Sequence, residues 1–183
     1  MSIDFAGFSG ETLHGVIQEP LDKIRIGQLR PESVTLRILI PDPHQSWPFP
    51  CRVEDLADEP AFRERAEHIS RRHTDAITES VTELADLGLV GAASADVRVH
   101  GGTPTFKLYI LNRDEAFFGF YPLTEHTVAL RGQPVPMYDL MGKDVTLFHY
   151  ETGDDPGGIG AQFVEQAQAW FDSMWATISR PPQ

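Results

Sequence analysis

Apolar residues recur along three stretches of the chain at intervals of three and four, the period of an amphipathic helix. The first stretch, residues 11–26, contains Pro20, which lacks an amide proton and crowds the preceding turn, so a kink or break is expected there. A second helix is predicted over residues 61–87, with Gly88 placed to end it, and a third over residues 159–178.

Short runs rich in β-branched and aromatic residues predict the strands. Residues 3–8 and 34–40 form two such runs, each followed by a turn signal. Arg131-Gly132 and Met141-Gly142 fit hairpin or meander turns, and residues 41–60, with five of the fourteen prolines, are expected to form a long loop. Further strands are predicted over residues 96–100, 106–111, 116–122, 127–130, 135–140 and 145–150.

This order of elements predicts the fold class. Helices alternate with the first strands, a block of strands follows, and a helix comes last, which favours an α/β (α+β) fold with a mixed β-sheet flanked by helices. A chain of 183 residues is of ordinary size for one domain with its own hydrophobic core, so residues 1–183 are expected to form a single domain.

The composition argues against several classes of protein. The chain carries 15 Lys and Arg against 27 Asp and Glu, a formal net charge of −12, whereas nucleic-acid binders present a basic face to phosphate. No apolar stretch is long enough to span a bilayer, and the first ten residues do not resemble a secretory signal. The single cysteine, Cys51, cannot form an internal disulfide. These features favour a cytoplasmic protein that does not hold DNA by itself and has no membrane partner.

Familiar catalytic and metal-binding motifs are missing from the sequence: G-x-S-x-G, H-E-x-x-H, C-x-x-C and a Walker loop do not occur. The seven histidines are scattered, and none is paired at a metal-binding helix spacing, although His68 and His73 come near. His73 lies on the apolar stripe of the second predicted helix, where a core histidine is more common than a ligand. Neither a metal nor a cofactor is expected.

One segment of the sequence resembles a known catalytic motif. Residues 105–112 resemble the phospholipase D signature H-x-K-x-x-x-x-D, with Thr105, Lys107 and Asn112 at the His, Lys and Asp positions. In that family the His attacks phosphorus, the Lys holds phosphoryl oxygens and the Asp supports the site. Residues 118–121 fall where the family has a G-S-x-N segment, and only the glycine, Gly119, is shared. A threonine hydroxyl is a poor nucleophile without a base, so the resemblance implies a polar, lysine-containing pocket that has lost its hydrolase machinery.

The wider chain resembles the phospholipase D-like effector domain of bacterial winged helix-turn-helix regulators of the GntR type. This resemblance implies the signal-receiving half of a regulator that meets DNA only through a separate winged-helix domain, which this chain lacks. The chain is then expected to be either an excised domain or a stand-alone relative. The segments that carry the likeness are residues 3–6, 34–42, 83–90, 106–112, 117–122 and 168–173.

Several residues are candidates for contact with a ligand. Ser9 and Gly10 lie at a strand-to-helix turn, where free backbone N–H groups suit an anion, although a plain helix cap is the alternative. Arg37 alternates with apolar neighbours in a strand, so it either pairs with a carboxylate or points into a pocket. Asp42 and His100 are expected at the pocket rim, because ligands gather beyond strand ends in sheets flanked by helices.

The strand around Lys107 supplies the other candidates. Thr105 and Lys107 share one face of that strand by its period of two, and Asn112 lies just beyond its end. Phe120 and Tyr121 are expected to form an apolar wall. The alternative for Lys107 is a solvated strand lysine, because lysine is rarely buried.

These residues favour a non-catalytic domain that binds a small-molecule effector, with an anionic metabolite as one candidate, and signals to a DNA-binding domain. A homodimer is expected through the apolar face of the last helix, at Trp170, Phe171, Met174 and Trp175, although such a stripe is more often core. Two alternatives stay open. One is a degenerate phosphodiesterase or nuclease that uses Lys107 with His100 or His126, and the other is a protein-interaction module.

Overall fold

The structure is a computed structural model that describes residues 1–143 and 145–183. In chain order its elements are β1 (Ser2–Ala6), α1 (Glu11–Arg25), β2 (Ser33–Pro41), β3 (Cys51–Arg52), α2 (Pro60–Asp86), β4 (Ala92–His100), β5 (Phe106–Leu111), β6 (Glu115–Phe120), β7 (Leu123–Leu130), β8 (Gln133–Leu140), β9 (Phe148–Glu151) and α3 (Ile159–Thr177). None of the described helices is both long and apolar enough to cross a membrane.

Six strands form a mixed sheet in the order β4-β2-β1-β5-β6-β9. Strands β1, β2 and β4 run parallel, joined by the crossover helices α1 and α2, and β5, β6 and β9 extend the sheet with antiparallel pairings. Strands β3, β8 and β7 form a second, antiparallel sheet. The predicted class, a mixed sheet flanked by helices, is confirmed.

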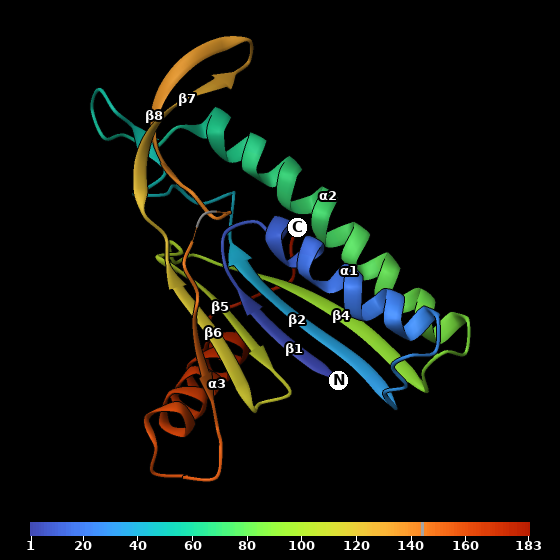
Figure 1. Cartoon of the computed structure of the whole chain (residues 1–183). Helices are drawn as coiled ribbons and strands as arrows, with labels where there is room; N and C mark the ends of the chain where they lie inside the picture. The colour runs from blue at the N-terminus through green and yellow to red at the C-terminus, as the bar shows by residue number, and fades with distance from the viewer. Residues whose placement is uncertain (144) are drawn as a thin grey trace.

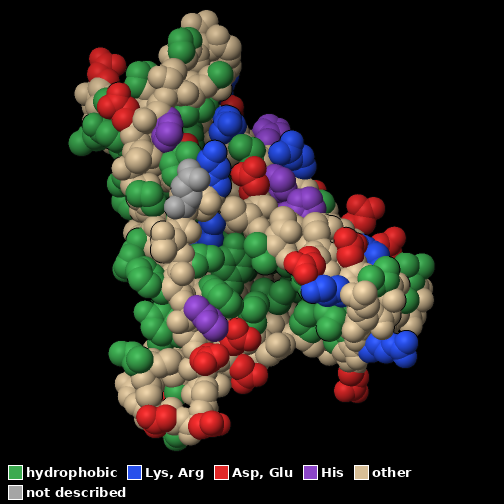
Figure 2. Space-filling model, viewed as in Figure 1, with side chains coloured by type: hydrophobic (Ala, Val, Ile, Leu, Met, Phe, Trp, Pro, Cys, Tyr) green, Lys and Arg blue, Asp and Glu red, His purple; other side chains and the backbone are tan. Residues whose placement is uncertain are grey.

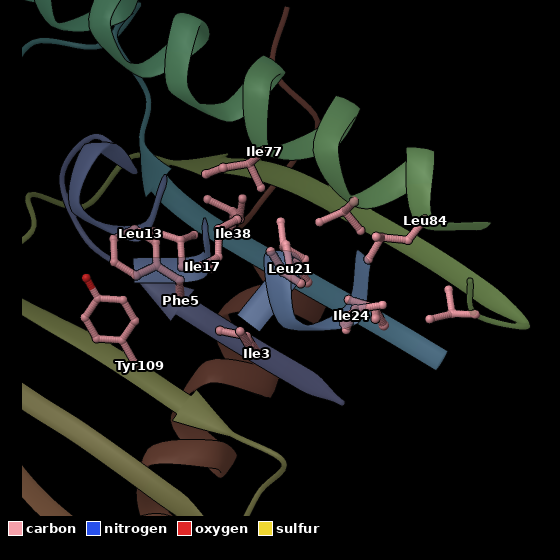
Figure 3. Packing of buried hydrophobic residues seen from close by; sticks show 14 of the residues in the cluster. Ile3, Phe5, Leu13, Ile17, Leu21, Ile24, Ile38, Ile77, Leu84 and Tyr109 are labelled. Atoms are coloured by element: carbon pink, nitrogen blue, oxygen red, sulfur yellow. The ribbon is translucent and has the colours of Figure 1, made fainter. Parts of the chain in front are cut away.

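The two faces of the main sheet are covered by different helices, because side chains alternate along each strand. Helices α1 and α2 lie side by side on one face, and α3 lies on the other (Figure 1). On the first face Phe5 and Ile38 pack under Leu21 and Ile77, and Tyr109 extends the same cluster onto β5 (Figure 3). On the second face Leu39 and Ile110 pack against Phe171 and Val164 of α3.

A buried ion pair fastens α3 to the sheet. The Nε and Nη2 atoms of Arg37 donate to the two carboxylate oxygens of Asp4 at 2.7 and 2.6 Å, and Nη2 also donates to Asp172 of α3 at 2.7 Å. Gln168 donates to both carboxylates. Because the guanidinium group also lies over the ring of Phe171, at 4.9 Å from its centre, Arg37 is held on every side by its own chain.

The second sheet packs on the first half of α2. Trp47, Phe62 and Met137 form a small separate core there. Arg131 and Gly132 both have positive φ, 49° and 81°, as a two-residue hairpin turn requires, so the predicted turn between β7 and β8 is confirmed. This hairpin extends beyond the main sheet, near the N-terminal end of α2 (Figure 1).

Two local features differ from expectation. Met141-Gly142 does not close a hairpin, because β8 before it and β9 after it belong to different sheets. Of the kink or break expected at Pro20, the break does not occur, since helix α1 continues from Glu11 to Arg25. The residue one turn earlier, Val16, is 60 % exposed, so water can reach the carbonyl that Pro20 leaves without a donor.

The segment after α3 returns to the free edge of the sheet. The backbone of Arg180 exchanges two hydrogen bonds with Val99 of β4, at 2.8 and 3.0 Å. The Arg180 side chain donates to the buried carboxylate of Asp42 at 2.6 Å. The segment that follows α3 is thereby tied to the end of β4 and to Asp42.

The apolar face of α3 is part of the core. Phe171 is completely buried, and Trp170, Met174 and Trp175 pack partly buried against the same cluster. Phe171 is therefore not available to a partner, because it is buried against the chain's own sheet. Trp170, Met174 and Trp175 are only partly buried, and the homodimer through this helix stays a prediction.

Replacing Phe171 by Ala should therefore lower the free energy of unfolding by about 3–5 kcal/mol, the usual cost of an aromatic-sized cavity. Urea denaturation followed by circular dichroism measures this change. The matched control is Ile159→Ala on the same helix, where the side chain is 81 % exposed and a change within about 0.5 kcal/mol is expected. Equal small effects for both variants would contradict the assignment of this face to the core.

Candidate functional site

A cleft of about 860 Å³ lies between the two sheets. Its walls are the first turn of α1, the first half of α2, the β7–β8 hairpin and the segment that follows β8. The side chains of Lys107 and Tyr121 contribute from the main sheet and its β6–β7 connection. The cleft thus joins parts of the chain that belong to both sheets.

Lys107 is the most unusual residue of the cleft. Its side chain is on the same sheet face as Tyr109, beneath α1, and only 4 % of the residue is exposed. The Nζ atom donates to the backbone carbonyl of Gly142 and lies 5.8 Å from the centre of the Tyr121 ring. No carboxylate among the described residues forms an ion pair with it. Burial lowers the pKa of Lys107 to about 8, opposed in part by the negative charge of Glu11.

Gly119 explains how the carbonyl of Gly142 reaches Lys107. Gly119 pairs directly with Lys107 across β5 and β6. A Cβ atom added to Gly119 would lie only about 2.5 Å from the Thr146 carbonyl oxygen and closer still to the side chain of Val145. The absence of a side chain there lets residues 145–147 lie directly on the sheet. Gly119 is the position that agrees with the phospholipase D pattern, and its role in this chain is close packing.

The first turn of α1 forms the polar side of the cleft. Gly10 precedes the helix with a positive φ of 69°, and no described side chain caps the helix. Ser9, Gly10 and Thr12 line the cleft next to this turn. The hydroxyl oxygen of Tyr121 accepts a hydrogen bond from the backbone N–H of Phe8 at 3.2 Å, and burial raises the pKa of Tyr121, so its phenol is neutral.

The described lining residues carry more positive than negative charge. Five are Lys or Arg and three are Asp or Glu, in a chain whose formal net charge is −12. Lys, Arg and His side chains gather between the hairpin and α2, beside a hollow with hydrophobic walls (Figure 2). The cations are Arg65, Arg72, Lys107, Arg131 and Lys143, of which Arg131 is paired with Glu64 at 2.8 Å. Burial raises the pKa of Asp139, the carboxyl group at the end of β8.

The structure brings four of the predicted ligand residues together. Ser9, Gly10, Lys107 and Tyr121 all line this cleft. Arg37 does not, because it lies on the opposite face of the sheet and is fully engaged by Asp4 and Asp172. Of the two readings that the sequence left open for Arg37, the carboxylate pair is the correct one.

Asp42 and His100 lie away from the cleft. Asp42 is 1 % exposed and accepts from the backbone N–H of His44 and the side chains of Gln45 and Arg180, so its carboxylate is already satisfied. It borders a smaller cavity of about 370 Å³ beside Trp47. His100 is buried, its Nδ1 accepts from the N–H of Gly102, and burial lowers its pKa. Neither residue lines the cleft around Lys107, and Asp42 lines the smaller cavity instead.

The T-x-K-x4-N pattern does not assemble into one site. Asn112 follows β5 with a positive φ of 53°, where its Oδ1 accepts the N–H of Ser2 at 2.9 Å. Five residues of extended strand separate it from Lys107, a span of about 16 Å. Thr105 is exposed just before β5 and does not line the cleft. Phe120 is 66 % exposed and is not part of the apolar wall, which Tyr121 shares with Phe8 and Phe62.

Sequence reasoning missed most of the cationic side chains of the cleft. Arg65 and Arg72 are seven residues apart on α2 and therefore on one face of the helix, with His68 between them, a signal that the sequence does contain. Arg131 and Lys143 come from turns that lie at least 59 residues beyond Arg72, and no local pattern points to them. His73, predicted as a core histidine, is half-buried and shares a 3.1 Å hydrogen bond between ring nitrogens with His14 of α1.

Metal binding has no preformed site in residues 1–143 and 145–183, where no three His, Cys, Asp or Glu side chains are grouped to hold an ion. Comparison of the chain with protein-family models, with curated proteins and with solved structures finds no match. The interpretation of the cleft therefore rests on its own chemistry.

Replacing Lys107 by Met should raise the free energy of unfolding at pH 7 by on the order of 1–3 kcal/mol, because Met fills a similar volume without a buried charge. The pKa of Lys107 falls from 10.5 in the unfolded chain to about 8 in the fold. The folded state therefore binds fewer protons between these values, and the stability of the wild type rises with pH across that window. The advantage of the variant should be largest below pH 8 and shrink towards pH 10.5.

Urea denaturation at pH 7, 9 and 10 measures this trend. Lys23→Met serves as the control, because Lys23 is exposed on α1 and pairs only with Glu19 of its own helix. For Lys23→Met we expect a change within about 0.5 kcal/mol and no such dependence on pH. A Lys107→Met protein that is less stable than the wild type at pH 7 would show that the contacts of the ammonium group outweigh the cost of its burial.

Proposed function

We propose that this chain is a non-catalytic, effector-binding domain that holds a small anionic metabolite in the cleft around Lys107. The observation that carries the proposal is the ammonium group of Lys107, buried at the cleft without a carboxylate partner among the described residues. A bound anion would supply the missing negative charge. Because an opposite charge favours the protonated amine, such a ligand would also raise the pKa of Lys107 from about 8.

Other features of the cleft support an anionic ligand. The first turn of α1 presents backbone N–H groups and the positive end of the helix dipole. Arg72 and Lys143 add positive charge at the rim, and the neutral hydroxyl of Tyr121 lies within the pocket. Phe8 and Phe62 provide apolar walls for the carbon skeleton of a metabolite.

The position of the cleft supports a role in signalling. A ligand there would touch α1 and Lys107 of the main sheet as well as the hairpin of the second sheet. It would then favour the arrangement of the two sheets in which both sets of contacts are made, which is a shift between populations of conformers. We propose that this shift is passed to a winged-helix DNA-binding domain, as in the GntR-type regulators that the sequence resembles, and that the chain acts in the cytoplasm.

The geometry favours binding over turnover. A phospholipase D-type site needs a nucleophile beside its lysine, and here Thr105 and Asn112 lie outside the cleft. His100 lies outside it too, and His126 is bonded to Thr124 on β7. We therefore rank the phosphodiesterase alternative below a sensor.

A panel of small metabolites tests the proposal by thermal shift. At least one carboxylate or phosphate should raise the unfolding midpoint of the wild type, with about 2.7 kcal/mol of stabilisation at one hundred times its Kd. The response should vanish in Lys107→Met, because the variant removes the buried cation, and persist in Lys23→Met. A panel without any anion response, or with equal responses in the two variants, would exclude this cleft as an anion site.

Phosphodiester turnover by the purified chain provides a separate test of the non-catalytic assignment. We expect no hydrolysis of bis(p-nitrophenyl) phosphate above the buffer rate. Robust hydrolysis that disappears in Lys107→Met and survives in Lys23→Met would replace the sensor with an enzyme.

A further inference from the structure

We infer that the cleft takes up small anionic aldehydes or 2-oxo acids by forming a reversible imine between their carbonyl carbon and the Nζ atom of Lys107. This inference rests on the proposed function, since it concerns the same cleft and names the class of its ligand. It adds a covalent step that anion binding alone does not need.

The placement of the amine supports imine formation. An amine must be uncharged to attack a carbonyl, and a lysine that is desolvated away from carboxylates is more readily uncharged. Lys107 is 96 % buried, and the Gly142 carbonyl accepts one of its N–H groups, which leaves the lone pair of the neutral amine available to a ligand in the cleft. With a pKa of about 8, roughly a quarter of the amine is neutral at pH 7.5.

The cleft also provides groups that can move protons. Glu11 lines the cleft, and its negative charge is close enough to Lys107 to oppose the fall in the pKa of that amine. Its carboxylate can take a proton from the attacking amine and return it to the departing oxygen. The ring of Tyr121, whose phenol stays neutral, lies 5.8 Å from Nζ and adds an apolar wall beside the reacting amine.

The bonds and protons of this step balance without an oxidant or a reductant. The lone pair of Nζ forms a bond to the carbonyl carbon while the C=O π pair moves to the oxygen, and one proton passes from Nζ to that oxygen to give a carbinolamine. The one remaining proton of Nζ then passes to the hydroxyl group, which leaves as water with the C–O bonding pair while the nitrogen lone pair forms the C=N bond. The net change is amine plus carbonyl to imine plus one water, and hydrolysis reverses it.

The charges around the cleft select among carbonyl compounds. Arg65, Arg72 and Lys143 line the same cleft as the first turn of α1, so a carboxylate or phosphate on the ligand has partners within the pocket. A neutral aldehyde would lack those contacts. We therefore expect pyruvate, glyoxylate and glyceraldehyde 3-phosphate to react faster than uncharged propionaldehyde.

Reductive trapping tests the inference directly. The full chain is incubated at pH 7.5 with each carbonyl probe and sodium cyanoborohydride, which reduces an imine to a stable secondary amine, and the product is mapped by mass spectrometry. The chain has only three lysines, at positions 23, 107 and 143, so assignment of the adduct is simple. We expect at least one anionic probe to label Lys107 at least tenfold more than Lys23 or Lys143.

Two variants and one matched ligand complete the experiment. Lys107→Arg keeps the positive charge but has no nucleophilic amine, so the adduct should be lost, whereas Lys23→Arg should label like the wild type. Since the wild-type map alone locates the adduct, the result does not depend on the folding of Lys107→Arg. Labelling of Lys107 that does not exceed that of Lys23 and Lys143 with all three anionic probes overturns the inference.

A thermal-shift comparison of lactate with pyruvate distinguishes failure of the imine inference from failure of the proposed anion site. Lactate has the carboxylate and size of pyruvate but no ketone. If lactate and pyruvate both raise the unfolding midpoint and none of the three anionic probes labels Lys107, the anion site stands and the imine does not. If no anion stabilises the chain and none labels Lys107, both proposals fall.

Discussion

Removing an ammonium group from water costs several kcal/mol unless other groups replace the lost solvation. At Lys107 the replacements are weak ones, a single backbone carbonyl from Gly142 and the face of the Tyr121 ring. Tyr121 is held beside β5 by the hydrogen bond from its backbone N–H to the carbonyl of Thr105, and Gly119 lets residues 145–147 lie close to the sheet. The shape of the cleft therefore follows from how the chain surrounds one positive charge without neutralising it.

A second, partly buried cation shows the contrast. Arg37 lies on the other face of the same sheet, where Asp4 of β1 and Asp172 of α3 accept its hydrogen bonds and Gln168 of α3 donates to both carboxylates. Because carboxylates of the chain neutralise its charge, Arg37 holds α3 on the sheet and is not free to bind a ligand. The difference between these two sites lies in the partners and not in burial, because both side chains are largely removed from solvent. A buried cation that is paired with carboxylates of its own chain stabilises the fold. A buried cation without such a partner is the better indicator of a binding site.

Local patterns predicted the elements well because helices and strands are set mainly by near neighbours. The three helices and most of the strands lie within a few residues of their predicted bounds, including α2, which ends just before Gly88. The site was harder because its parts are distant in sequence. The strand period placed Lys107 correctly toward a pocket, but it could not show that Asn112 belongs to a turn at the far end of β5. Arg37 has one partner 135 residues away, which no local pattern encodes.

The hydrogen bonds between Arg180 and Val99 have a consequence for association between molecules. Strand β4 is an outer strand of the main sheet, and its free backbone groups could pair with a strand from another chain. The segment after α3 occupies part of that border and is pinned there by Asp42. Detaching this segment would leave a longer row of unpaired N–H and C=O groups on β4, so intermolecular β-pairing and aggregation would become easier while the interior stayed intact.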